Sequence, residues 1–201
     1  MNGSDYPVRV TYAPDSGQNR LWGIPLVGLV IRSILILPQA IVLAILALVA
    51  ALAFLISWAP ILFNGRMAGW GYTLYGGFLR LSLRVSVYVL LMTGRYPPFG
   101  PGGEHSAGLD FDETEAQNRL WGIPILGVMV RYILLIPHLL VLWVLGLVVG
   151  ILSLFTWVPV LLNARTGHWV VKYVGGYYRW STRVAAYALL LTGRYPPFSL
   201  D

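Results

Sequence analysis

The chain repeats itself after 99 residues. The stretch QNRLWGIP occupies residues 18–25 and returns at 117–124, and TGRYPPF occupies residues 93–99 and returns at 192–198. Between these markers, two stretches of 82 residues align without a gap and are identical at about half of their positions. Self-similarity of this kind marks a duplicated structural unit. The chain therefore divides into a first repeat with its N-terminal segment (1–99), a Gly-rich acidic linker (100–116) and a second repeat (117–201).

The repeats are too apolar for a water-soluble domain. The chain is 57% hydrophobic and 11% charged, whereas soluble domains carry about 25% charged residues. Residues 40–58 contain no charge at all, and about 20 apolar residues suffice to cross a bilayer. The polar start of the chain, residues 1–20, lacks the apolar core of a cleavable signal. We expect an all-α membrane protein built by tandem duplication.

Each repeat holds three apolar segments of unequal quality. In the first repeat, Gln39–Phe63 is the strongest predicted span, and Trp70–Met92 is apolar but carries two arginines. The segment Leu21–Leu37 is short, and Pro38 predicts a break after it. We expect four full transmembrane helices, with residues 21–37 and 120–136 as short membrane-embedded or interfacial helices. Six spans is the alternative.

The segments that flank the repeats predict short strands and an orientation. Residues 6–12 alternate apolar and polar side chains, and residues 107–112 do so more weakly. With two spans per repeat, more arginines flank the end that carries the termini and the linker than the opposite end. The positive-inside rule then places both termini in the cytoplasm, which predicts a multi-pass protein of the cell inner membrane.

Charge is divided sharply between the repeats and the rest of the chain. All eight carboxylate side chains lie outside residues 18–99 and 117–198, whereas those stretches hold thirteen basic residues. A guanidinium group in an apolar segment needs a counter-charge, and phospholipid phosphate is an abundant anion that arginine binds well. The predicted lipid- or anion-binding residues are Arg32, Arg80, Arg84, Arg131, Arg179 and Arg183.

The sequence argues against most catalytic chemistry. It has no cysteine, which excludes disulfides and thiolate catalysis. Within the repeats, His138 and His168 have no carboxylate partner, and no phosphate-binding glycine loop is present. We therefore expect no catalytic residue, no metal site, no cofactor and no nucleic-acid partner.

Two stretches of the second repeat carry a family resemblance. They are ILLIPHLLVLWVLG (133–146) and YRWSTRVAAYALLLTGRYPPFSL (178–200). They resemble the bacterial membrane-protein family known as domain of unknown function 4389, and the resemblance extends over both repeats. The first repeat differs in having Gln39 in place of His138 and Leu81 in place of Trp180. The resemblance implies a multi-helix membrane domain and assigns no activity.

These observations favour a non-catalytic function. We expect an accessory or scaffolding protein that binds anionic membrane lipids, partner membrane subunits or further copies of itself. The alternative is a small transporter or channel for an anionic solute along the arginine stripes. A membrane-embedded enzyme is the third hypothesis, and it needs a contact between a hydroxyl group and a histidine.

Overall fold

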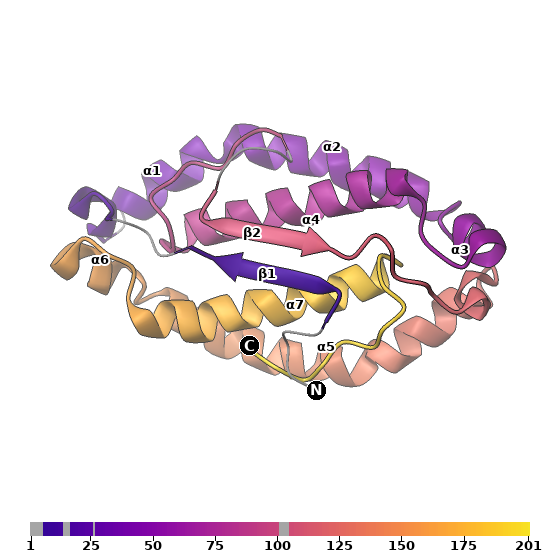
Figure 1. Ribbon diagram of the computed structural model, residues 1–201. Helices are drawn as coiled ribbons and strands as arrows, with labels where there is room; N and C mark the ends of the chain where they lie inside the picture. The colour runs from indigo at the N-terminus through magenta and orange to yellow at the C-terminus, as the bar shows by residue number, and fades with distance from the viewer. Residues whose placement is uncertain (1–5, 14–16, 26, 101–104) are drawn as a thin grey trace.

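The computed structural model describes residues 6–13, 17–25, 27–100 and 105–201 (Figure 1). Three of the eight carboxylates, Asp5, Asp15 and Glu104, lie outside these ranges. The chain is mostly helical and contains two corresponding sets of elements, as the duplication predicts.

The first set runs from the N-terminus to the linker. It consists of the strand β1 (Val8–Tyr12), the 3₁₀ helix η2 (Arg20–Gly23), and the helices α1 (Val27–Leu35), α2 (Leu37–Phe54), α3 (Trp58–Asn64) and α4 (Gly69–Val89). The second set consists of β2 (Ala107–Phe111), η3 (Arg119–Gly122), α5 (Leu126–Ser153), α6 (Trp157–Asn163), the π-helical segment η4 (Val170–Gly175) and α7 (Gly176–Ala188). Both predicted strands are present.

Proline has different effects in the two repeats. The break expected at Pro38 is present, because α1 ends at Leu35 and α2 begins at Leu37. In the second repeat, α5 continues through Pro137. The expected separate short helix at 120–136 is therefore wrong for this repeat. One proline removes a single N–H from the helix, and α5 has helical turns on both sides of it.

The strongest predicted span is two helices rather than one. α2 ends at Phe54 and α3 begins at Trp58, so Gln39–Phe63 is interrupted by a turn. Pro60 lies in the first turn of α3, where its missing N–H removes no intrahelical hydrogen bond.

Two segments are long and apolar enough to cross a membrane, namely Leu37–Phe54 and Leu126–Asn163. Only 11% and 17% of their most apolar windows are buried inside the protein, unlike the core helix of a soluble domain. The expected four spans, and the alternative of six, are not confirmed. α4 has the length but not the hydropathy, because Arg80 and Arg84 lie in it, and α7 is only 13 residues long.

The two strands form a ribbon that lies across α4 and α7 (Figure 1). They pair antiparallel, with Val10 opposite Leu109 and Arg9 opposite Asp110. Val10 and Leu109 are equivalent positions, since they are 99 residues apart. A two-fold axis that relates two antiparallel strands is perpendicular to their sheet. The pseudo-two-fold axis of the duplication therefore passes through this residue pair, perpendicular to the ribbon.

The repeats are interlocked rather than side by side. η2 of the first repeat packs on α6 of the second, and η3 packs on α3. The backbone N–H of Gln18 donates to the carbonyl of Ala164, and that of Gln117 donates to the carbonyl of Gly65, each at 2.7 Å. α2 packs against α4 and α5 against α7, so α2 and α5 lie outside the central helix pair. Each repeat thus completes the packing of the other.

Candidate functional site

Arg131 is fully buried and its guanidinium group is held by protein atoms. Its Nη1 donates to the carbonyls of Tyr187 and Thr192, both at 2.9 Å, and its Nη2 donates to Oε1 of Gln117 at 2.8 Å. The aromatic rings of Trp121 and Tyr187 flank it, with centroids 5.1 and 4.6 Å from Cζ. The exposed fraction of Arg131 is 0%.

Arg32 occupies the equivalent place in the first repeat. Its Nη1 donates to the carbonyls of Tyr88 and Thr93, and its Nη2 donates to Oε1 of Gln18. Trp22 and Tyr88 flank it, with ring centroids 5.0 and 4.4 Å from Cζ. The exposed fraction of Arg32 is also 0%. The duplication has therefore preserved one buried arginine site twice.

The acceptors of both arginines come from the ends of α4 and α7. Leu91 and Leu190, just beyond these helices, have left-handed backbone conformations with φ of 60° and 64°. This conformation is uncommon for a residue with a side chain, and it turns the chain back so that carbonyls on both sides of the turn face one guanidinium. A positive charge at the carboxyl end of a helix is also favoured by the helix dipole.

Arg80 and Arg84 lie one turn apart on α4. Nε of Arg80 donates to the carbonyl of Leu109 at 2.8 Å, and its Cζ lies 5.4 Å from the centroid of Phe111. Nη1 of Arg84 contacts the carbonyl of Gly100 at 3.4 Å. Since β2 lies in the linker and belongs to the second set of elements, Arg80 joins a helix of the first set to the strand of the second.

Arg179 and Arg183 are the corresponding residues of the second repeat. Nη1 of Arg179 donates to the carbonyl of Leu200 at 2.8 Å, and its Cζ lies 5.1 Å from the ring of Tyr12 in β1. Cζ of Arg183 lies 6.0 Å from the ring of Tyr6. The six predicted arginines do not form one site. Arg32 and Arg131 lie at opposite ends of the molecule, while the other four contact the ribbon, the segment before it, the linker or the C-terminal segment.

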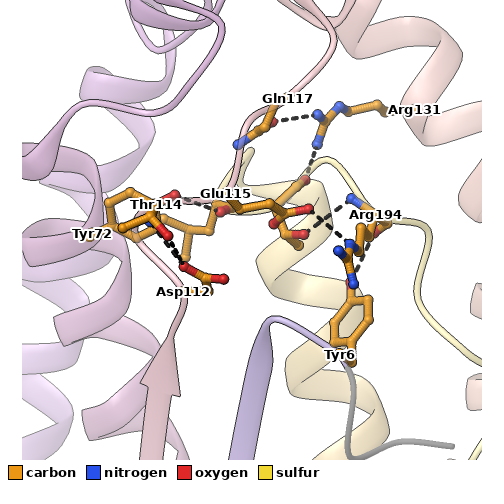
Figure 2. Close-up of polar contacts among 10 residues, drawn as sticks. Tyr6, Tyr72, Asp112, Thr114, Glu115, Gln117, Arg131 and Arg194 are labelled. Carbon is orange, nitrogen blue, oxygen red and sulfur yellow. Dashed lines mark hydrogen bonds and ion pairs between the residues drawn. The ribbon is translucent and has the colours of Figure 1, made fainter.

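A carboxylate from the linker lies close to the Arg131 site. Glu115 is 8% exposed in its side chain, and Oε1 lies 3.7 Å from Nε of Arg194. Its side chain also hydrogen-bonds to Thr192, whose carbonyl accepts from Arg131. Figure 2 shows Glu115 between Arg194 and the Gln117–Arg131 pair. In the second repeat, the linker thus supplies a carboxylate to Arg194, which is not one of the six predicted arginines.

The pKa of Glu115 predicts a pH dependence. Burial raises the pKa of this carboxyl above its ordinary value, against the opposing effects of Thr192 and Arg194. Because the folded protein binds this proton more tightly than the unfolded chain, the contribution to stability is present at low pH and is lost as pH rises through the raised pKa. We expect the melting temperature of Glu115→Gln to rise relative to wild type as the pH increases from the ordinary titration range of a carboxyl group to neutrality. Exposed Glu113→Gln is the control, and parallel pH profiles of wild type and Glu115→Gln contradict the expectation.

His138 is a packed core residue. Its Nδ1 accepts a hydrogen bond from Nε1 of Trp180 at 3.1 Å, and its ring stacks on Phe198 at 3.8 Å. In the first repeat, Gln39 takes its place and donates to the carbonyl of Pro97. The segment TGRYPPF therefore covers one buried polar side chain in each repeat.

A polar cavity lies at one end of the molecule, and no metal cluster is found among the described residues. A cavity of about 780 Å³ opens where α3 meets α4, and Arg66, Arg119 and Glu113 are among its lining residues. None of the six predicted arginines lines it. Among the described residues, no group of three His, Asp or Glu side chains is placed to hold a metal ion.

Comparison with known proteins identifies the repeated unit. The family model described as a domain of unknown function (DUF4389) matches residues 27–100 and 126–199. The chain belongs to the DUF4389 family. The two matches are tandem copies that cover more than half of the chain, which confirms the resemblance seen in the sequence. No curated protein and no solved structure matches the chain.

Several residues that the sequence did not single out lie outside the DUF4389 matches. Gln18 and Gln117 precede the two matched ranges, and Glu115 lies in the linker between them. The exact repetition of QNRLWGIP was a signal for the glutamines, because a glutamine that opens an invariant phrase needs a structural reason. Glu115 had no such signal, since the equivalent position 16 is serine.

Proposed function

We propose that this protein is a non-catalytic membrane component that binds anionic lipid and acts as an accessory or scaffolding subunit, in the cytoplasmic membrane of a bacterial cell. The observation that carries the proposal is the uncovered apolar surface of α2 and α5. Leu48, Leu52, Leu140 and Ile151 each expose more than 60% of their surface. Exposed apolar area on this scale marks a surface that meets lipid or another protein.

Exposed arginines supply the anion-binding part of the proposal. Arg20, Arg66, Arg119 and Arg165 are all exposed and lie next to the apolar helices. Arg32 and Arg131 are less suited to lipid, because both of their terminal nitrogens donate to the protein itself. The proposal therefore relies on the exposed set, and the lipid-contacting roles predicted for the six inner arginines stay predictions.

Anion transport is the alternative, and the contacts favour it less. A transport path needs water along Arg80, Arg84, Arg179 and Arg183. In the described residues, Arg80 and Arg179 donate to backbone carbonyls of the ribbon and the C-terminal segment. These contacts support a structural role for the arginine stripes.

Native mass spectrometry tests the lipid proposal. We expect the variant with Arg20, Arg66, Arg119 and Arg165 all changed to glutamine to retain several-fold less phosphatidylglycerol than wild type, because four phosphate-pairing groups are lost. Retention of phosphatidylcholine should not change. Arg9→Gln is the control, since Arg9 lies on the outer face of the ribbon. Equal retention of phosphatidylglycerol by wild type and the fourfold variant would overturn the proposal.

A further inference from the structure

The pseudo-two-fold symmetry allows two orientations of the protein relative to a membrane. α4 runs from the end where α3 meets η3 to the end where η2 meets α6, and α7 runs the opposite way (Figure 1). If the long helices cross the bilayer, the axis lies in the membrane plane and the two ends of the molecule are on opposite sides. If the axis is perpendicular to the membrane, the helices lie parallel to its surface and both ends are on one side.

We propose that the helices lie parallel to the membrane surface, with the apolar faces of α2 and α5 embedded in one leaflet and the ribbon in water. This inference rests on the proposed membrane association and adds its geometry. The occupant of the apolar surface is the acyl region of a single leaflet. A helix is about 10–12 Å across, which fits half of a hydrocarbon core of about 30 Å.

The position of the charged ribbon on the pseudo-two-fold axis favours the surface orientation. Because the axis passes through Val10 and Leu109, a spanning orientation places the ribbon at the middle of the bilayer. Its outer face exposes Arg9, Thr11 and Asp110. Each charged side chain at that depth costs at least about 2.5–3.5 kcal/mol on insertion scales. Lipid-exposed open sheet edges do not occur in the hydrocarbon region. With the axis perpendicular to the membrane, this face meets water.

The distribution of exposed arginines between the two ends also favours the surface orientation. The pseudo-symmetry places three exposed arginines at each end of the molecule, which are Arg20, Arg95 and Arg165 at one end and Arg66, Arg119 and Arg194 at the other. With exposed Lys172 in η4, the end that holds α6 carries four basic residues against three at the other end. A spanning protein takes its orientation from an excess of positive charge on one side, and this excess is only one residue. With the helices parallel to the surface, both ends, and with them all six arginines, are on the same side of the membrane.

The length of α5 is also consistent with the surface orientation. α5 contains 28 residues, or about 42 Å at 1.5 Å per residue. This exceeds a hydrocarbon core of about 30 Å, so a spanning α5 would have to tilt or extend beyond the core at its ends. A helix that lies along the surface has no such length limit.

The chain has no cysteine, which permits a direct test. Asn64 and Asn163 are exposed, equivalent residues at opposite ends of the molecule. The double variant Asn64→Cys/Asn163→Cys is reconstituted in vesicles of phosphatidylcholine and phosphatidylglycerol and treated with a membrane-impermeant maleimide. Intact mass then counts the labels on each molecule. If the helices lie parallel to the membrane surface, each molecule carries two labels or none. This holds whether the protein is bound to the outer or the inner leaflet of the vesicle. A spanning orientation predicts one label on every molecule, and that result overturns the inference.

Two controls separate this inference from the proposed function. Flotation of the vesicles reports whether the protein is membrane-bound at all, and protein that stays at the bottom as soluble dimers refutes membrane association itself. Full labelling of both thiols in detergent shows that they are reactive in the folded protein. A second double variant, Thr11→Cys/Asn64→Cys, should again give two labels or none, because the ribbon and the ends face the same water phase. One label per molecule there contradicts the placement of the ribbon in water.

Discussion

Gly122→Ala is expected to prevent the two repeats from interlocking. A Cβ atom on Gly122 would lie 2.3 Å from the backbone N of Leu62 and 2.8 Å from the carbonyl O of Trp58. Both are backbone atoms of α3 that no rotamer change can move, so η3 would have to leave α3. We expect a loss of about 3 kcal/mol or more in the free energy of unfolding, measured by thermal unfolding in detergent.

The matched control for this prediction is Gly150→Ala. No atom lies within 4 Å of a Cβ at Gly150, which is in α5. Alanine there should leave stability unchanged or raise it by up to about 1 kcal/mol. Gly23→Ala should repeat the effect of Gly122→Ala, because its Cβ would lie 2.4 Å from the backbone N of Leu161. An unchanged melting temperature for both Gly23→Ala and Gly122→Ala would refute the interlocked arrangement.

Arg131→Met is the second change with a large expected effect. It removes the donors for the carbonyls of Tyr187 and Thr192 and for Oε1 of Gln117. A buried polar atom left without its partner costs about 1–3 kcal/mol, so three such atoms predict a loss of about 3 kcal/mol or more. The loss is measured by thermal unfolding of the purified protein.

Two comparisons make the Arg131 prediction specific. Arg119→Met changes an exposed arginine nearby and should have an effect within about 0.5 kcal/mol. Arg131→Lys should recover only part of the stability, because an ammonium group lacks the planar fork that serves separated acceptors. Equal melting temperatures for Arg131→Met and Arg119→Met would show that the buried network contributes nothing.

The buried arginine sites show how a correct sequence pattern leads to an incomplete conclusion. In the sequence, Arg32 and Arg131 stand out as basic residues in apolar segments without nearby acids. Such groups need a partner, and backbone carbonyls at the ends of α4 and α7 provide it. A sequence shows which side chains are charged and does not show which carbonyls a turn at Leu91 or Leu190 will present.

The motif TGRYPPF acquires a structural role through these contacts. Its threonine carbonyl accepts from the buried arginine, its first proline carbonyl accepts from Gln39 in the first repeat, and its tyrosine hydroxyl donates to α1 or α5 at Leu35 or Leu134. The segment therefore packs on α1 and α2 in the first repeat and on α5 in the second. This role explains why it occurs twice, since each copy of the unit needs its own closure.

The sequence by itself determined the duplication, the family, the apolar character, the two short strands and the helix break at Pro38. These features depend on composition, repetition or the geometry of a few neighbouring residues. Only the tertiary structure decided that β1 pairs with β2, that η2 and η3 each pack on the opposite repeat, and that Glu115 approaches Arg194. The physical reason is that the two repeats carry nearly the same local signals. The local sequence of an element is therefore compatible with packing on its own repeat or on the other one. Only the packing of the whole chain selects between these two partners.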